Sequence, residues 1–315
     1  MDVRDYYIVQ KLTENAELYE QLGTKEKFWF RDLSSPDSQR TLFKYSRPNT
    51  GEHWSEKCAE QLCELLEIPH VKYDIAIHDD RYGVVSPNIV DKNEHLVMGN
   101  ELLNKDDPDE YPAPVDFADN KQRITSHTVT RVLAFLYKSK IQPPKSDFDL
   151  DGLDAAGVFC GYLMLDALIS NQDRHHENWA VIVEAMSGSP IFRLCPTYDH
   201  AASMGRELLD KERRERLTTK DRNRSVEKFV QKAQSQLYKF KTDKKPMKTL
   251  DAFIHAVQKY PLAKVHWLSK LDLLTEAKIK RVFDRIPPDL LSEVGREFAY
   301  KVVIENRKRL LKYYE

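Results

Sequence analysis

The sequence predicts an α+β protein in which a small β-rich part is followed by a larger, mainly helical part. In the N-terminal third, strand patterns surround one helical pattern in the order strand, strand, helix, strand, strand. A polar segment with prolines, residues 104–120, then precedes a series of helical patterns. A chain of 315 residues suits one large two-lobed domain or two modest domains. We expect two lobes, residues 1–97 and residues 98–315.

The first lobe is predicted from short runs of aromatic and β-branched residues. Four such runs have the character of strands: 28–30, 40–45, 71–77 and 82–85. The segment 34–38, Ser-Ser-Pro-Asp-Ser, predicts a turn that joins the first two strands into a hairpin. Apolar residues recur every fourth position over 54–66 and predict an amphipathic helix that ends before Pro69.

The second lobe is predicted to be built around one buried helix. Helical patterns cover residues 124–137, 155–169 and 293–314. The helix 155–169 is apolar almost all round, which is typical of a helix buried on every side. Residues 179–183 and 191–195 read as strands around Ser-Gly-Ser-Pro at 187–190, and therefore predict a hairpin.

Composition and charge narrow the classes of protein. With 41% hydrophobic residues, 31% charged residues and a net charge of -1, neither a disordered chain nor a generally basic nucleic-acid binder is indicated. The longest apolar stretch, 157–169, is too short to span a bilayer and contains Asp166. The four cysteines form no Cys-x-x-Cys pair. We expect a cytoplasmic protein that contacts neither membranes nor nucleic acid directly.

The polar loop after the buried helix carries the chemical signal. Asp173 stands five positions before Asn178, and Asp199 follows 21 residues later, beyond the predicted hairpin. Kinase-type catalytic loops have this spacing: the first Asp receives the hydroxyl proton, and the Asn and the second Asp hold magnesium. The spacing therefore predicts a phosphotransfer site.

Several further segments give the chain a resemblance to the HipA-like serine/threonine kinases, particularly the compact stand-alone members. These segments are Gly23-Thr24-Lys25-Glu26-Lys27, Leu42-Phe43-Lys44, Gly51-Glu52-His53-Trp54-Ser55-Glu56-Lys57, the Asp173 loop and Tyr198-Asp199-His200. The resemblance covers most of the chain. It implies a bilobal protein-kinase-like fold and ATP-dependent phosphorylation of a Ser or Thr hydroxyl of a protein. In that family the kinase is often a toxin restrained by a DNA-binding antitoxin, so the resemblance also implies an antitoxin-type partner.

The resemblance assigns roles by position. Lys44 resembles the strand lysine that contacts the ATP phosphates, and Glu56 resembles the helix glutamate that holds this lysine. Asp173 resembles the catalytic base. Asn178 and Asp199 resemble the two ligands of Mg²⁺, which prefers hard oxygen donors.

The remaining assignments concern the cofactor. Backbone N–H groups of a glycine-containing loop can bind phosphate, and the residues that resemble such a loop here are Gly23, Thr24, Lys25 and Lys27. In some family members a serine upstream of this glycine is autophosphorylated, but residues 19–22 contain none, which leaves Thr24 or Tyr19 as replacements. Two residues of the Asp173 loop, Arg174 and His175, are also assigned to the cofactor site. They would brace the Asp173 loop by hydrogen bonds to its backbone or to Asp199. His176, the next residue, is expected to be exposed.

Other functions stay open on the residues alone. A metal-dependent phosphohydrolase could use a cluster of ligand-type side chains: His175, His176, Asp199 and His200. The Asp173 loop also resembles that of phosphoinositide kinases, so a lipid substrate is an alternative to a protein. A pseudokinase could use the fold for binding only. The basic stretch 206–248 is interleaved with acidic residues and indicates a solvated surface, with contact to a protein substrate as a further hypothesis.

Overall fold

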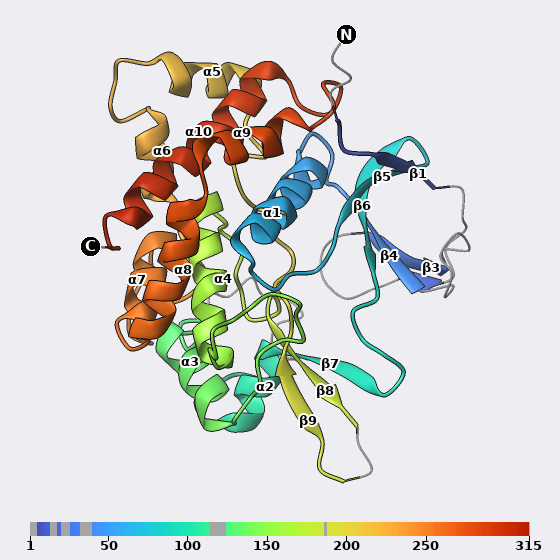
Figure 1. The fold of residues 1–315 in the computed structure, drawn as a ribbon, viewed down its shortest axis with the longest axis vertical. Coiled ribbons are helices and arrows are strands. Elements are labelled where there is room, and N and C mark those ends of the chain that lie inside the picture. Colours follow the sequence, from blue (N-terminus) through green and yellow to red (C-terminus); the bar gives the residue numbers. More distant parts are fainter. Residues whose placement is uncertain are drawn as a thin grey trace.

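The structure is a computed structural model that describes residues 5–12, 18–19, 26–31, 40–113, 124–185 and 188–314. It has a β-rich N-terminal part beside a larger helical part, as predicted (Figure 1). The loop residues Gly23, Thr24 and Lys25, together with Tyr19's side chain, lie outside what the structure describes.

The N-terminal sheet has six strands in the order β1-β5-β6-β4-β3-β2. Its strands are β1 (Val9–Lys11), β2 (Leu18–Tyr19), β3 (Lys27–Arg31), β4 (Arg40–Tyr45), β5 (Asp74–His78) and β6 (Arg81–Pro87). Strands β3 and β4 pair antiparallel, which confirms the predicted pairing of the first two strands, and the predicted turn 34–38 lies outside the described residues. Strands β5 and β6 also pair antiparallel. Alternate residues of β3 and β4 point inward, and Phe28, Phe30 and Phe43 form the centre of a small aromatic core on one face.

One helix, α1 (Glu52–Leu66), connects the sheet to the rest of the protein. It contacts β5 and β6 and also the helices α8 (Pro261–Leu273) and α9 (Glu276–Asp284), so it lies between the two parts (Figure 1). The helix ends at Glu67, whose left-handed backbone lets its N–H reach back to carbonyls of the last turn. Pro69 follows, as the sequence predicts.

The C-terminal part contains a three-stranded sheet in the order β7-β8-β9 and helices packed around α4. The strands are β7 (Glu94–Met98), β8 (Ala180–Glu184) and β9 (Ile191–Leu194). The helices besides α1, α8 and α9 are α2 (Gly99–Asp106), α3 (Val129–Lys138), α4 (Ala155–Ile169), α5 (Asp210–Thr218), α6 (Val226–Lys232), α7 (Thr249–Val257) and α10 (Glu293–Leu311). Strand β7 was not predicted, and it pairs with β8, so the second sheet begins before residue 98.

Helix α4 is the buried helix that the sequence predicts, because every one of its residues is buried. It packs against α3, α7, α8 and α10. Helix α3 begins at Val129 and not at the predicted residue 124, because the Thr128 side chain caps it by accepting a hydrogen bond from the Arg131 N–H. No helix in the described ranges is long and apolar enough to cross a membrane. All four cysteines are free and buried.

Candidate active site

A buried ion pair positions the loop that follows α4. Arg174 is only 1% exposed. Its Nε and Nη2 donate to the two carboxylate oxygens of Asp166 in α4, each at 2.8 Å, and its Nη1 donates to the Asn178 carbonyl at 2.7 Å. Two parallel bonds between a guanidinium and a carboxylate fix orientation as well as distance. The loop is therefore anchored at its middle and its end to α4, in which every residue is buried.

This geometry gives Arg174 the predicted bracing role in the loop. Its guanidinium nitrogens are directed to Asp166 and Asn178 inside the protein. These contacts do not support a role for Arg174 in binding the cofactor, whereas the predicted hydrogen bond to the loop backbone is present. His175 is partly exposed, and its Nε2 lies 4.0 Å from the Asp173 carboxylate.

The Asp173 backbone is held on both sides while its carboxylate remains accessible. Its N–H donates to Asn171 Oδ1 at 3.2 Å, and its carbonyl accepts from Asn178 Nδ2 at 2.5 Å. The Asp173 side chain is 43% exposed. A fixed backbone with a carboxylate open to solvent is what a base acting on an incoming hydroxyl group needs.

The β8–β9 hairpin connects Asn178 to Asp199, as the sequence predicts. Asn178 precedes β8, and Asp199 comes five residues after β9 ends. The Tyr198 hydroxyl donates to the Glu177 carbonyl at 2.8 Å, so the chain segments at the two ends of the hairpin lie side by side. Because the Asn178 amide nitrogen is bonded to Asp173, its amide oxygen is the group left to ligate a cation.

Lys44 and Asp199 join the two parts of the protein. Lys44 lies on β4, and its Nζ is 2.8 Å from Asp199 Oδ1. Burial disfavours the Lys44 ammonium, but the carboxylates of Asp199 and Glu56 outweigh this effect and raise the lysine pKa above its ordinary value. Lys44 is therefore charged at neutral pH and suited to an anionic ligand.

Glu56 lies near Lys44 but does not form the predicted ion pair with it. Both line one small pocket, yet the ion pairs among the described residues join Lys44 to Asp199 instead. The Glu56 carboxylate is fully buried and accepts from the backbone N–H groups of His200 at 2.7 Å and Ala201 at 3.0 Å. A buried carboxylate needs such donors, and these bonds fasten α1 to the segment after Asp199.

Other predicted residues have mixed outcomes. Lys27 is the residue opposite Lys44 in the β3–β4 register, which puts both lysines at one end of the sheet. His176 is buried, contrary to the expected exposure, and its Nδ1 is hydrogen-bonded to the Tyr111 hydroxyl at 2.6 Å. His200 is also buried, and its Nε2 is bonded to the Thr197 hydroxyl at 2.8 Å.

The burial of His176 makes stability depend on pH. Burial, and to a smaller extent His175, lowers the pKa of His176 to about 4, from about 6.5 when exposed. Between pH 6.5 and 4, His176 is protonated in the unfolded chain but largely neutral in the folded chain. Protonation therefore stabilises the unfolded chain, and the free energy of unfolding should fall as the pH drops from 6.5 to 4. The expected loss is on the order of 1 to 3 kcal/mol.

Urea unfolding at several pH values measures this loss. The His176→Gln variant should show a shallower decline below pH 6.5 than the parent chain. The same change at His95, which is exposed on β7, should leave the decline unaltered. Parallel pH curves for the parent and His176→Gln would contradict the assignment.

Comparisons with known proteins show what this arrangement is similar to. No family model and no curated protein matches the sequence. Among solved structures, the Helicobacter pylori proinflammatory kinase CtkA matches with a TM-score of 0.68 and 15% identity, over 98% of this chain and 97% of that chain. A chain of the Shewanella oneidensis MR-1 toxin–antitoxin complex of HipA, HipB and operator DNA matches with a TM-score of 0.56 and 13% identity, over 95% of this chain and 66% of that chain. The chain thus has the two-lobed α+β fold of HipA-like kinases, as its sequence predicts.

Proposed function

We propose that the chain is an ATP- and Mg²⁺-dependent protein kinase of the HipA-like type, which transfers the γ-phosphate to a serine or threonine hydroxyl. The observation that carries the proposal is the ion pair between Lys44 on the N-terminal sheet and Asp199 at the end of the β8–β9 hairpin. A phosphate-binding lysine and a metal-binding aspartate must meet across the two lobes of a kinase. The structural likeness to the kinase CtkA supports the same reading.

Each residue has a definite task in this proposal. Asp199 and Asn178 would hold magnesium through oxygen atoms, and the ion, when bound, neutralises charge on the phosphates. Lys44 supplies a further positive charge from the sheet, with Lys27 at the same end. Asp173 accepts the proton of the acceptor hydroxyl as the hydroxyl oxygen attacks the γ-phosphorus, the bond to the β–γ bridging oxygen breaks and ADP leaves.

The metal-dependent phosphohydrolase is less well supported by the side-chain geometry. Within the described ranges, the one cluster of three His, Cys, Asp or Glu side chains close enough to hold a metal ion includes none of the residues proposed for it. His176 and His200 instead make hydrogen bonds inside the protein. Nδ1 of His176 and both ring nitrogens of His200 are therefore committed to structural contacts.

A partner and a setting complete the proposal. The HipA neighbour comes from a complex with HipB and operator DNA, so we propose an antitoxin-type protein partner for this chain as well. We also propose a protein substrate and a reducing, cytoplasmic setting, which the four free thiols fit. Pull-down of a protein encoded beside this chain would test the partner.

Phosphotransfer is tested with the purified chain, γ-labelled ATP, Mg²⁺ and a cytoplasmic lysate. We expect label on serine or threonine of lysate proteins, and no label when EDTA removes the metal. Lys44→Ala should lower the rate roughly tenfold to a hundredfold, since a hydrogen bond to a charged group contributes about 1.5 to 3 kcal/mol. Lys138→Ala, at an exposed lysine of α3, is the matched control.

Different outcomes would select different functions. Phosphate ester hydrolysis that survives Lys44→Ala would select the phosphohydrolase. ATP binding without transfer to any acceptor would select the binding module. Label that appears in phosphoinositide vesicles and not in proteins would select a lipid kinase.

A further inference from the structure

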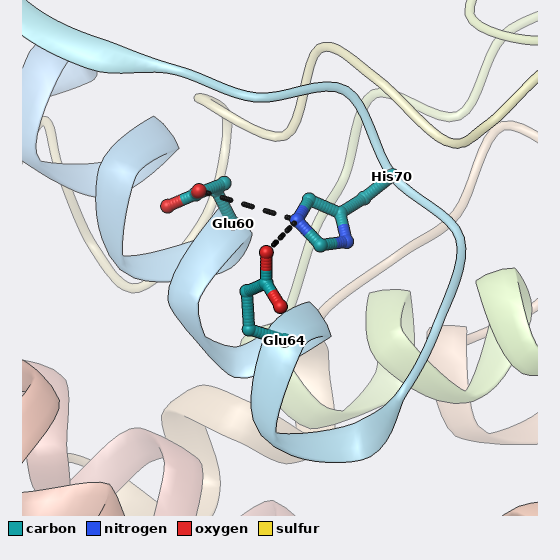
Figure 2. A group of neighbouring side chains, drawn as sticks. All are labelled: Glu60, Glu64 and His70. Carbon is teal, nitrogen blue, oxygen red and sulfur yellow. Dashed lines mark ion pairs between the residues drawn. The ribbon is translucent and has the colours of Figure 1, made fainter. Parts of the chain in front are cut away.

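Three ligand-type side chains meet at the C-terminal half of α1, away from the Lys44–Asp199 pair. Glu60 and Glu64 are one helical turn apart on α1, and both point toward His70 on the segment that follows the helix (Figure 2). His70 Nε2 lies 3.4 Å from Glu64 Oε1 and 4.0 Å from Glu60 Oε1. One donor atom from each residue lies within 4.8 Å of the other two.

The hydrogen bonding of His70 shows which nitrogen is available. Nδ1 lies 2.7 Å from the Ile68 carbonyl, which can only accept, so Nδ1 carries the proton in the neutral ring. Nε2 is buried without a hydrogen-bond partner among the described residues, and the side chain is 3% exposed. Burial lowers the pKa of His70 below its usual value, which favours this neutral ring. A lone pair on Nε2 thus faces two carboxylates.

The neighbours of Glu60 fix the orientation of its carboxylate. Its Oε2 forms an ion pair with Lys57 Nζ at 3.0 Å and accepts a hydrogen bond from Gln61 Nε2 at 2.9 Å, which leaves Oε1 toward His70. Lys57 is itself bound to the Asp74 carboxylate and the Tyr73 carbonyl, so its charge is shared with groups outside the cluster. Such outer contacts orient ligands in metal sites.

The spacing suits a transition-metal ion. Bonds of about 2.1 Å in a tetrahedral site separate neighbouring ligand atoms by about 3.4 Å, which is the observed distance between His70 and Glu64. A small rotation of Glu60 would close the remaining gap. One imidazole with two carboxylates is a donor set for zinc and similar ions, whereas magnesium prefers oxygen donors alone.

We propose that Glu60, Glu64 and His70 bind a divalent transition-metal ion of the zinc type, with water as a fourth ligand. Glu64 is 40% exposed and provides access from solvent. The site requires no phosphotransfer and is independent of the proposed kinase function.

The position of the site gives the ion a structural effect. His70 forms an isolated β-bridge with Thr197, in which Thr197 N donates to the Pro69 carbonyl and Val71 N donates to the Thr197 carbonyl. Glu60 lies one turn beyond Glu56, whose carboxylate binds the backbone after Asp199. An ion bound by Glu60, Glu64 and His70 would therefore be a second link between α1 and the Asp199 segment, in addition to the hydrogen bonds of Glu56.

Calorimetric titration of the chelator-treated full chain with ZnCl₂ tests the site. We expect one equivalent of zinc to bind, and His70→Gln and Glu64→Gln each to weaken that binding at least about tenfold. His95→Gln on the exposed face of β7 and Asp199→Asn in the candidate active site should bind like the parent. Equal binding by the parent and both ligand variants would overturn the proposal, as would loss of binding in Asp199→Asn alone.

Thermal unfolding gives a second measurement. Zinc should raise the midpoint of the parent and of His95→Gln, since an ion that binds only the folded state stabilises it. At the same zinc concentration it should raise the midpoint of Glu64→Gln much less, because this variant binds zinc more weakly. The Glu64 side chain is partly exposed and can change without loss of the fold. An equal rise in Glu64→Gln would overturn the proposal, even if His70→Gln failed to fold.

Discussion

Asp173→Asn is expected to lower the rate of phosphotransfer by a factor of about 10² to 10⁴, because a positioned general base contributes roughly that much. The amide keeps the shape of the carboxylate but cannot take the proton of the acceptor hydroxyl. The Asp173 backbone is held by hydrogen bonds to Asn171 and Asn178, and an asparagine leaves these bonds in place, so the loop should keep its conformation. The initial rate of protein labelling at saturating Mg-ATP measures the effect.

A matched variant separates loss of the base from a general effect of removing charge. Asp147→Asn changes another exposed aspartate on a loop, before α4, and should label at the parent rate. Both variants should have the parent's circular dichroism spectrum and bind Mg-ATP. An Asp173→Asn variant as active as the parent would remove Asp173 from the role of base.

The sequence predicted the Asp173 loop and its hairpin because the determinants are local. A helix that is apolar all round must be buried, and a polar run directly after it must return to the surface. The two strands that follow are close in sequence, so their pairing needs no knowledge of distant segments. Strand β7 was missed, because its pairing with β8 depends on residues more than eighty positions away.

Which atoms pair at the site could not be predicted in the same way. The resemblance supplied Lys44 and Glu56 as partners, but in the structure Asp199 binds Lys44 while Glu56 binds backbone N–H groups. Asp199 and Glu56 are both acids near Lys44. The packing of α1 on the segment after β9 decides which of the two carboxylates pairs with the lysine. His176 was misjudged for the same reason: its burial comes from Tyr111 and His127, which are distant in sequence.

One missed feature did have a signal in the sequence. Asp166 is the single charged residue of the apolar helix α4, and a buried charge requires a partner. Arg174, which stands eight residues later in the loop that follows the same helix, is the nearest candidate partner. The residues alone therefore favour Asp166 as the partner of Arg174 over a place for this arginine in the cofactor site.

Arg174→Met is expected to lower the free energy of unfolding by about 3 to 5 kcal/mol, because it leaves the buried Asp166 carboxylate without its cation. The loss includes the bond to the Asn178 carbonyl, so the Asp173 loop should also lose its anchor at that end. Urea unfolding followed by tryptophan fluorescence measures the change.

Arg224→Met is the control that distinguishes burial from charge. Arg224 also pairs with a carboxylate, that of Glu215 at 2.9 Å, but its side chain is 62% exposed. Solvent screens an exposed pair, so this substitution should cost only about 0 to 1 kcal/mol. Similar losses in the two variants would mean that the Asp166–Arg174 pair is no more stabilising than a surface pair. A large loss confined to Arg174→Met would identify this pair as the support of the loop, since water cannot reach Asp166 to replace the guanidinium.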